Sequence, residues 1–231
     1  RPMQVVISGS NRGLGLGFVR ALLARGDRVV AGCRQPGRAT ALTTLSGEYP
    51  GHLHVLPLDV AKPASIHEFA SELPLVCDRI DLLINNAGVL VPGERFGAVA
   101  AEPLESSFRT NAMGPLLLTQ ALADRLVDGA RVANLSSVMG SIAAAAEFRS
   151  PSYGMSKAAQ NMATVQLAHA LAPRGIAVVA LHPGWVHTEM GGDKAPLPID
   201  DAVAGLLRVI DGLELADSGR FLDWQGHALD W

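Results

Sequence analysis

The chain has 231 residues, of which 48% are hydrophobic, 18% charged and 5% aromatic, and its formal net charge is −3. This length and composition predict one globular domain over residues 1–231, with a core large enough to fold without a metal or a disulfide. The near balance of 19 basic and 22 acidic residues argues against nucleic acid as a partner.

Short apolar runs alternate with longer amphipathic stretches along the chain. Strands are expected at residues 4–8, 28–32, 53–58, 81–85, 131–135, 176–182 and 219–222. Helices are expected at residues 14–25, 38–46, 63–73, 104–126, 152–172 and 200–213. Several strands are apolar throughout, which indicates burial on both faces. The pattern predicts an α/β fold of Rossmann type, a doubly wound parallel sheet of about seven strands with helices on both faces.

The cysteines and the amino end indicate the cellular setting. Cys33 and Cys77 form no CxxC, and no Cys/His cluster has zinc spacing, so we expect two reduced thiols and no metal site. No apolar run approaches the roughly 18 residues of a membrane span. Val5-Val6-Ile7 leads straight into a glycine-rich turn, without the pattern of a signal peptide. We therefore expect a cytoplasmic protein with no membrane partner.

The first expected strand ends in a glycine-rich turn, Ser8-Gly9-Ser10-Asn11-Arg12-Gly13-Leu14-Gly15. Gly9 permits the tight turn, and the lack of side chains at Gly13 and Gly15 lets the backbone approach a pyrophosphate. The helix that follows points its free N–H groups at that anion. Such glycines can also simply end a strand, but their position at the first strand-to-helix junction favours a dinucleotide site.

The end of the second strand indicates which dinucleotide is bound. NAD enzymes usually carry an acidic residue there, which grips the ribose 2′-OH. Here the position is Cys33, followed by Arg34, and Arg12 lies inside the glycine-rich turn. Two guanidinium groups match the oxygens of a 2′-phosphate, unless both are only solvated surface charges. The sequence favours NADP(H) over NAD.

A tyrosine and a lysine form the candidate proton-transfer pair. The chain has only two tyrosines, and Lys157 follows Tyr153 by four residues, which places both on one helix face. A free tyrosine has a pKa of ~10, too high for proton exchange at neutral pH. A neighbouring ammonium would stabilise the phenolate and lower that pKa. We predict Tyr153 as the proton donor and Lys157 as the group that tunes it.

Taken in order, these motifs resemble the short-chain dehydrogenase/reductase family. The GxxxGxG turn is followed by Asp59-Val60, Asn85-Asn86-Ala87-Gly88, Asn111, Ser136-Ser137, Tyr153 with Lys157, and Pro183-Gly184 with Thr188. The resemblance covers essentially the whole chain. Within the family, residues 182–192 and the ending with Phe221, Asp230 and Trp231 are similar to the branch of sniffer-type carbonyl reductases and C-factor-like proteins.

The resemblance implies roles for individual residues. It implies a catalytic tetrad of Asn111, Ser137, Tyr153 and Lys157, in which Ser137 bonds the substrate carbonyl and Asn111 anchors a water that links Lys157 to solvent. Asp59 would bond the adenine amino group, Val60 would flank the ring, and Thr188 would bond the nicotinamide carboxamide. The residues expected to hold the cofactor are Gly9, Ser10, Asn11, Arg12, Gly13, Leu14, Gly15, Arg34, Asp59, Val60, Asn86, Ala87, Gly88, Tyr153, Lys157, Pro183, Gly184, Val186 and Thr188.

The implied reaction is reduction of a small-molecule aldehyde or ketone to an alcohol, with hydride from NADPH and a proton from Tyr153. Two alternatives stay open: a cofactor-sensing or signalling protein of the same fold, and a 3-oxoacyl-thioester reductase.

The largely apolar residues 138–149, with Trp185 and Met190, favour substrates with hydrophobic bodies. Residues 141–151 are expected to bulge either over the substrate mouth or outward into solvent. We also expect a homodimer built on the helices at 104–126 and 152–172.

Overall fold

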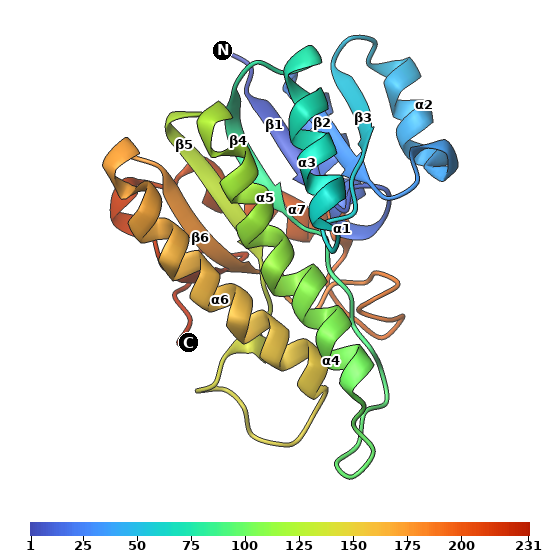
Figure 1. Cartoon of the computed structure of the whole chain (residues 1–231), viewed down its shortest axis with the longest axis vertical. Helices are drawn as coiled ribbons and strands as arrows, with labels where there is room; N and C mark the ends of the chain where they lie inside the picture. Colours follow the sequence, from blue (N-terminus) through green and yellow to red (C-terminus); the bar gives the residue numbers. More distant parts are fainter.

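A seven-stranded parallel sheet forms the middle layer of the molecule (Figure 1). The computed structural model describes residues 1–231. The strands are β1 (Gln4–Ser8), β2 (Arg28–Cys33), β3 (Leu53–Pro57), β4 (Ile80–Asn85), β5 (Leu126–Leu135), β6 (Ala177–His182) and β7 (Phe221–Asp223). Their order across the sheet is β3-β2-β1-β4-β5-β6-β7. The expected doubly wound fold of Rossmann type is confirmed.

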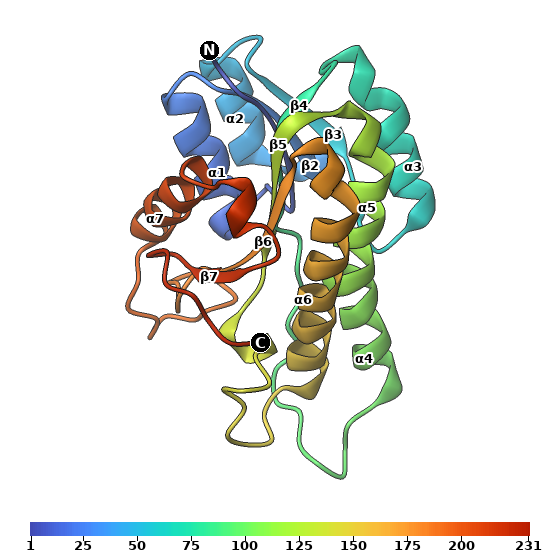
Figure 2. The ribbon, with the colours of Figure 1, turned by 90° about the vertical axis from the view of Figure 1, so that its left-hand side faces the viewer.

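Helices cover both faces of the sheet (Figure 2). One face carries α1 (Gly13–Ala24), α2 (Thr40–Glu48) and α7 (Ile199–Asp211), and the other carries α3 (Pro63–Glu72), α4 (Ala101–Phe108), α5 (Gly114–Leu122) and α6 (Pro151–Leu171). Side chains of β1 alternate between two separate cores, because Val5 and Ile7 pack under α1 whereas Val6 packs toward α3. This two-sided burial explains why the strands are apolar throughout. None of the helices is both long enough and apolar enough to cross a bilayer.

The strand order reverses direction between β1 and β4, and in open α/β sheets ligands bind beyond the carboxyl ends of the strands at such a point. The Ser8 hydroxyl at the end of β1 accepts hydrogen bonds from the backbone N–H groups of Asn86 and Ala87, each at 3.0 Å. These bonds fasten the start of the loop after β4 to the glycine-rich turn. Two of the expected cofactor motifs are thereby held side by side.

The expected helix at residues 104–126 is wrong in two respects. A turn of π-helix, Arg109–Met113, separates α4 from α5, and β5 already begins at Leu126. Asn111 lies within the π turn, and its side chain bonds both the N–H and the C=O of Val89, each at 2.9 Å. The early part of β5 contains the exposed Asp128 and Gly129, so no apolar run marks it in the sequence.

Candidate active site

Three of the four expected catalytic side chains meet at the carboxyl end of β5. Tyr153 lies in the first turn of α6 and is 7% exposed. The Ser137 hydroxyl, just after β5, lies next to the Tyr153 phenol. The Lys157 ammonium lies 5.6 Å from the centroid of the Tyr153 ring, one helical turn further along α6. The structure thus brings Tyr153, Lys157 and Ser137 together, and their catalytic roles stay a prediction.

The structure distinguishes the two neighbouring serines. Ser136 is buried, and its hydroxyl donates to Oδ1 of Asn161 at 2.7 Å, so it fastens β5 to α6. Ser137 points the other way: its Oγ accepts from the N–H of Met139 at 3.1 Å and lies next to the Tyr153 phenol. Successive side chains of an extended segment point to opposite faces, which explains the difference. Ser137 is therefore the serine that lies beside Tyr153.

Burial controls the protonation of the pair. It raises the pKa of Tyr153 to about 12, against the lowering effect of the hydrogen bond from Ser137. Burial also lowers the pKa of Lys157 to about 7, because the ammonium lies out of contact with water. The expected lowering of the tyrosine pKa by its lysine neighbour is thus not seen in the protein alone. At neutral pH Tyr153 carries its proton.

Lys157 is held by two acceptors inside the protein. Its Nζ donates to the carbonyl of Leu135 at 2.7 Å and to Oε1 of Gln160 at 3.1 Å. A Cβ added at Gly88 would lie 3.8 Å from this Nζ, so the loop after β4 passes directly beside the lysine. Sequence reasoning missed Gln160, although its position three residues after Lys157 on one helix face was a usable signal.

Asn111 serves the architecture of the site. Besides its two bonds to Val89, its Nδ2 donates to Oγ of Ser156 at 2.9 Å. The side chain thus joins the π turn, the loop after β4 and α6, and π turns inside helices are frequent at functional sites. The expected role of Asn111 in anchoring a water near Lys157 stays a prediction.

The amino end of α1 forms a cradle that fits a pyrophosphate. The residue just before it, Arg12, provides no side-chain cap, and the first turn contains no acidic residue. Gly13 has a φ of +56°, and a Cβ there would meet only the Thr188 methyl, at 3.9 Å. A Cβ on Gly9 would lie 2.7 Å from Cα of Ala87, so only glycine allows this close approach. Uncapped N–H groups facing open space are the donors that a dinucleotide phosphate requires.

Not every residue of the glycine-rich turn points at this space. Ser10 is fully buried, and its hydroxyl donates to the carbonyl of Gly32 at 2.9 Å. The expectation that Ser10 contacts the cofactor is therefore corrected for its side chain, which shapes the turn instead. The Asn86 amide likewise donates to the carbonyl of Gly9 at 2.9 Å. Asn11 is exposed, and Leu14 and Gly15 belong to the first turn of α1.

The expected 2′-phosphate site lies on two adjacent loops. Arg12 follows β1 and Arg34 follows β2, and both side chains are exposed. Arg12 pairs with Glu189 of the loop after β6, at 3.2 Å, in an ion pair that is open to solvent. Cys33 is buried, and burial raises the pKa of its thiol. No carboxylate occupies the position at the end of β2 that would bond a ribose 2′-OH.

The residues expected to contact adenine and nicotinamide follow β3 and β6, on opposite sides of the point between β1 and β4 where the strand order reverses. Asp59 is half-buried, and its Oδ1 accepts from the N–H of Ala61 at 3.0 Å. Val60 packs against Gly114 of α5, where an added Cβ would lie 2.9 Å from it. After β6, the Thr188 hydroxyl accepts from the N–H of Gly191 at 3.0 Å and still has its own proton to donate.

The segment after β6 carries the remaining expected cofactor residues, Pro183, Gly184 and Val186. Gly184 has a φ of +85°, and a Cβ there would lie 2.8 Å from the Leu197 side chain. The chain turns sharply here because glycine tolerates this conformation. Val186 is buried.

The rim of the site is apolar and exposed. Phe96 and Phe148 meet edge to face, with ring centroids 5.6 Å apart, and they join the loop after β4 to residues 141–150. Ile142 to Arg149 are all exposed, and the loop that contains them extends away from the sheet (Figure 1). Val138, Trp185 and Met190 are the other large exposed apolar side chains near the end of β5 and after β6.

A carboxylate from a distant loop caps α6, the helix that carries Tyr153 and Lys157. The N–H of Ser152 donates to Oε1 of Glu94 at 3.0 Å, and the Ser152 hydroxyl donates to Oε2 at 2.6 Å. The residue just before the helix, Ser150, has a φ of +44° and provides no side-chain cap of its own. Sequence reasoning missed Glu94, because its partner lies 58 residues away and no local pattern announces it.

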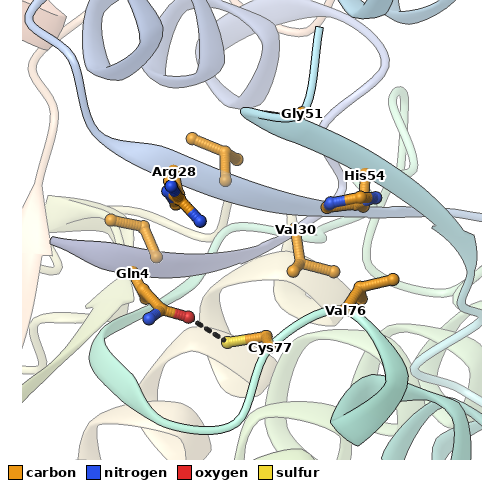
Figure 3. A pocket seen from close by; sticks show the side chains of 9 residues that line it. Gln4, Arg28, Val30, Gly51, His54, Val76 and Cys77 are labelled. Carbon is orange, nitrogen blue, oxygen red and sulfur yellow. Dashed lines mark hydrogen bonds between the residues drawn. The ribbon is translucent and has the colours of Figure 1, made fainter. Parts of the chain in front are cut away.

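A small cavity at the opposite end of the strands is separate from this site. It has about 20 Å³ and lies between the amino ends of β1, β2 and β3, lined by Gln4, Arg28, His54 and Cys77 among others (Figure 3). The Cys77 thiol donates to Oε1 of Gln4 at 3.2 Å, and burial raises its pKa to about 11. A protonated thiol and room for about one water give no basis for chemistry.

The comparisons with known proteins agree with this geometry. The family model of the short chain dehydrogenases matches residues 3–196. The chain belongs to the short-chain dehydrogenase family. Oxidoreductase is accordingly its general class.

Known members of the family are similar over most or all of the chain. C-signal of Myxococcus xanthus is 48% identical over 154 residues, which are 66% of this chain and 93% of that protein. The structure of NADPH-bound carbonyl reductase from chicken fatty liver is 37% identical, with a TM-score of 0.92, and covers 100% of both chains. The carbonyl reductase Sniffer of D. melanogaster is 30% identical, with a TM-score of 0.94 and the same coverage. The expected resemblance to the branch of sniffer-type and C-factor-like proteins is confirmed.

Proposed function

We propose that this short-chain dehydrogenase is an NADP(H)-dependent carbonyl reductase that converts an aldehyde or ketone into an alcohol. The observation that carries the proposal is the protonated, buried Tyr153 beside Ser137, next to a phosphate cradle at the end of the same sheet. The proposal is supported by the likeness to carbonyl reductases, one of them NADPH-bound, over the full length of the chain.

The cofactor assignment rests on charge at the ends of β1 and β2. Arg12 and Arg34 would bind the 2′-phosphate, and the uncapped start of α1 would bind the pyrophosphate. Asp59 and Val60 would contact the adenine. The adjoining ribose would lie against Asn86, Ala87 and Gly88. Thr188 would bond the nicotinamide carboxamide, and the chain around it would be shaped by Pro183, Gly184 and Val186. Bound NADPH supplies the hydride.

The protein supplies orientation and a proton. The Ser137 hydroxyl bonds the substrate carbonyl oxygen and holds it against the phenol of Tyr153, which donates its proton as the oxygen gains charge. Because burial keeps Tyr153 protonated at neutral pH, the acid form needed for reduction is fully populated. Leu135 and Gln160 hold Lys157 close to the tyrosine ring, where its ammonium form stabilises the phenolate left behind.

A panel of carbonyl compounds tests the proposal. The purified protein is mixed with NADPH and with aldehydes and ketones that carry apolar bodies, and the loss of NADPH absorbance is followed. The expected result is turnover of at least one compound, with NADPH far better than NADH. Absence of turnover over the whole panel, in a protein that binds NADPH, would contradict the proposal.

That last outcome would favour a second candidate, a cofactor-sensing or signalling role. The observation in its favour is the 48% identity to C-signal. The two candidates differ in one respect, because a sensor needs to bind the dinucleotide but does not need Tyr153 as an acid. Comparing NADPH affinity with turnover therefore separates them.

Assembly and location are part of the same proposal. Large apolar side chains are exposed on α4, α5 and α6, namely Phe108, Leu116, Met155 and Met162. Their exposure on adjacent helices supports a homodimer through this face, which a sedimentation mass of twice 24.2 kDa would demonstrate.

Cys33 and Cys77 are both unpaired and buried, which supports a reducing, cytoplasmic setting.

A further inference from the structure

A histidine side chain accepts a hydrogen bond from the backbone just after Ser137, where the pairing of β5 and β6 ends. The N–H of Ser136 donates to the carbonyl of Leu181 at 2.8 Å, as part of the pairing between β5 and β6. Two residues further on, the N–H of Val138 points in the same direction, but β6 turns away after His182 at Pro183. The Val138 N–H instead donates to Nδ1 of His182 at 3.1 Å. An imidazole nitrogen thus replaces the strand carbonyl that the sheet no longer provides.

The hydrogen bond defines the state of the ring. Since Nδ1 accepts from Val138, it carries no proton, and the ring is neutral with its proton on Nε2. Burial lowers the pKa of His182 below its usual 6.5, while the charge of Asp223 opposes this shift. The neutral ring that the bond requires is therefore the main form at neutral pH.

The charged and titratable neighbours of His182 come from two elements. Asp223 on β7 is its partner across the sheet, and the Asp223 carboxylate is already occupied by the N–H groups of Gln225 and His227 and by the His227 ring at 3.2 Å. On the other side, α6 brings Tyr153 and Lys157 to the same end of the sheet.

We propose that His182 is a positioning residue for the reductase reaction: its unprotonated Nδ1 holds the Val138 amide and thereby keeps the Ser137 hydroxyl directed at Tyr153. Ser137 starts the short helical turn Val138–Gly140, so the first amide of that turn fixes the peptide plane next to the serine. The inference rests on the proposed function, because it acts through the role of Ser137 there.

The direction of the pH effect follows from the bond. When the pH falls through the pKa of His182, a proton on Nδ1 meets the N–H of Val138, donor against donor, and the bond is lost. The turnover number is then expected to fall in acid, with a midpoint below 6.5. Above that midpoint the bond is intact, and His182 contributes no further pH dependence.

Two substitutions separate the acceptor from the titration. His182→Asn places a carbonyl oxygen at about the position of Nδ1 and does not titrate, whereas His182→Leu keeps bulk but offers no acceptor. We expect His182→Leu to lower kcat at least about 10-fold while the Kd for NADPH stays within about twofold. His182→Asn should keep kcat within about threefold of the parent and lose the acid decline. His169→Leu, on the exposed side of α6, is the matched control and should leave both unchanged.

Nuclear magnetic resonance gives a readout that does not need turnover. The Val138 amide signal should shift with the titration of His182 in the parent and not in His182→Asn. Its hydrogen exchange should accelerate in His182→Leu alone. If the parent reduces no carbonyl but the amide behaves in this way, the proposed function fails while the His182–Val138 bond stands.

Three outcomes would overturn the inference. They are a His182→Leu protein with parental kcat and pH profile, a His182→Asn protein that keeps the parental acid decline, and a Val138 amide that ignores the titration of His182. Where His182→Leu does not fold, the pH profile and the amide titration of His182→Asn decide the question by themselves.

Discussion

Removing the carboxylate of Glu94 should loosen the helix that carries Tyr153 and Lys157. Glu94 accepts two hydrogen bonds from Ser152, at 3.0 and 2.6 Å, at the start of α6. The neighbouring Pro151 has no N–H, and Ser150 provides no side-chain cap. In Glu94→Ala the amide and the hydroxyl of Ser152 both lose their acceptor. Because Ser152 itself is only 1% exposed, both of these donors are buried.

The size of the effect follows from the loss of a helix cap. Replacing a capping side chain by alanine costs about 0.5–2 kcal/mol. A buried donor left without an acceptor costs about 1–3 kcal/mol, and the half-exposed Glu94 lets water replace part of it. We expect a loss of about 1–2 kcal/mol in the free energy of unfolding, which lowers Tm by about 2–8 °C in a chain of this size. Ser152→Ala removes one of the two bonds and should cost about half as much.

A double-mutant cycle in urea or thermal unfolding measures the bond. Glu94→Ala, Ser152→Ala and the double variant should give a coupling free energy of at least about 0.5 kcal/mol. Glu105→Ala, an exposed glutamate on the neighbouring α4, is the control and should change stability by less than about 0.5 kcal/mol. A Glu94→Ala protein as stable as this control, or strictly additive effects, would refute the reasoning.

The remaining predictions concern the site itself. Tyr153→Phe should lower carbonyl reduction at least about 100-fold while NADPH binding and folding survive, because only the donated proton is removed; near-parental rates would exclude Tyr153 as the acid. Arg34→Ala should weaken NADPH binding by about 1.5–3 kcal/mol, or about 10- to 150-fold, and leave NADH binding unchanged, as calorimetry can measure. Phe148→Ala breaks the edge-to-face contact with Phe96 and should change the ranking of carbonyl substrates without weakening NADPH binding. Equal proportional changes over five chemically distinct substrates would show that this rim takes no part in selection.

The sequence by itself determined the fold class and predicted where the candidate site lies along the chain. Strands such as Val5-Val6-Ile7 are apolar throughout because each side chain enters one of two cores, and this two-sided burial is visible in the residue pattern. The glycine-rich turn and the spacing of Tyr153 and Lys157 are local patterns as well. Each involves neighbours within a few residues, whose geometry follows from the strand or helix that contains them.

Only the tertiary structure decided how these residues are held. The bonds of Glu94 to Ser152 and of His182 to Val138 join positions 58 and 44 residues apart, so they depend on strand order and loop course, which periodicity does not encode. The same holds for protonation. The spacing of Tyr153 and Lys157 predicts a lowered tyrosine pKa, but burial raises the pKa of Tyr153 to about 12 and lowers that of Lys157 to about 7. Removal from water is a property of the packed core and not of two neighbours on a helix.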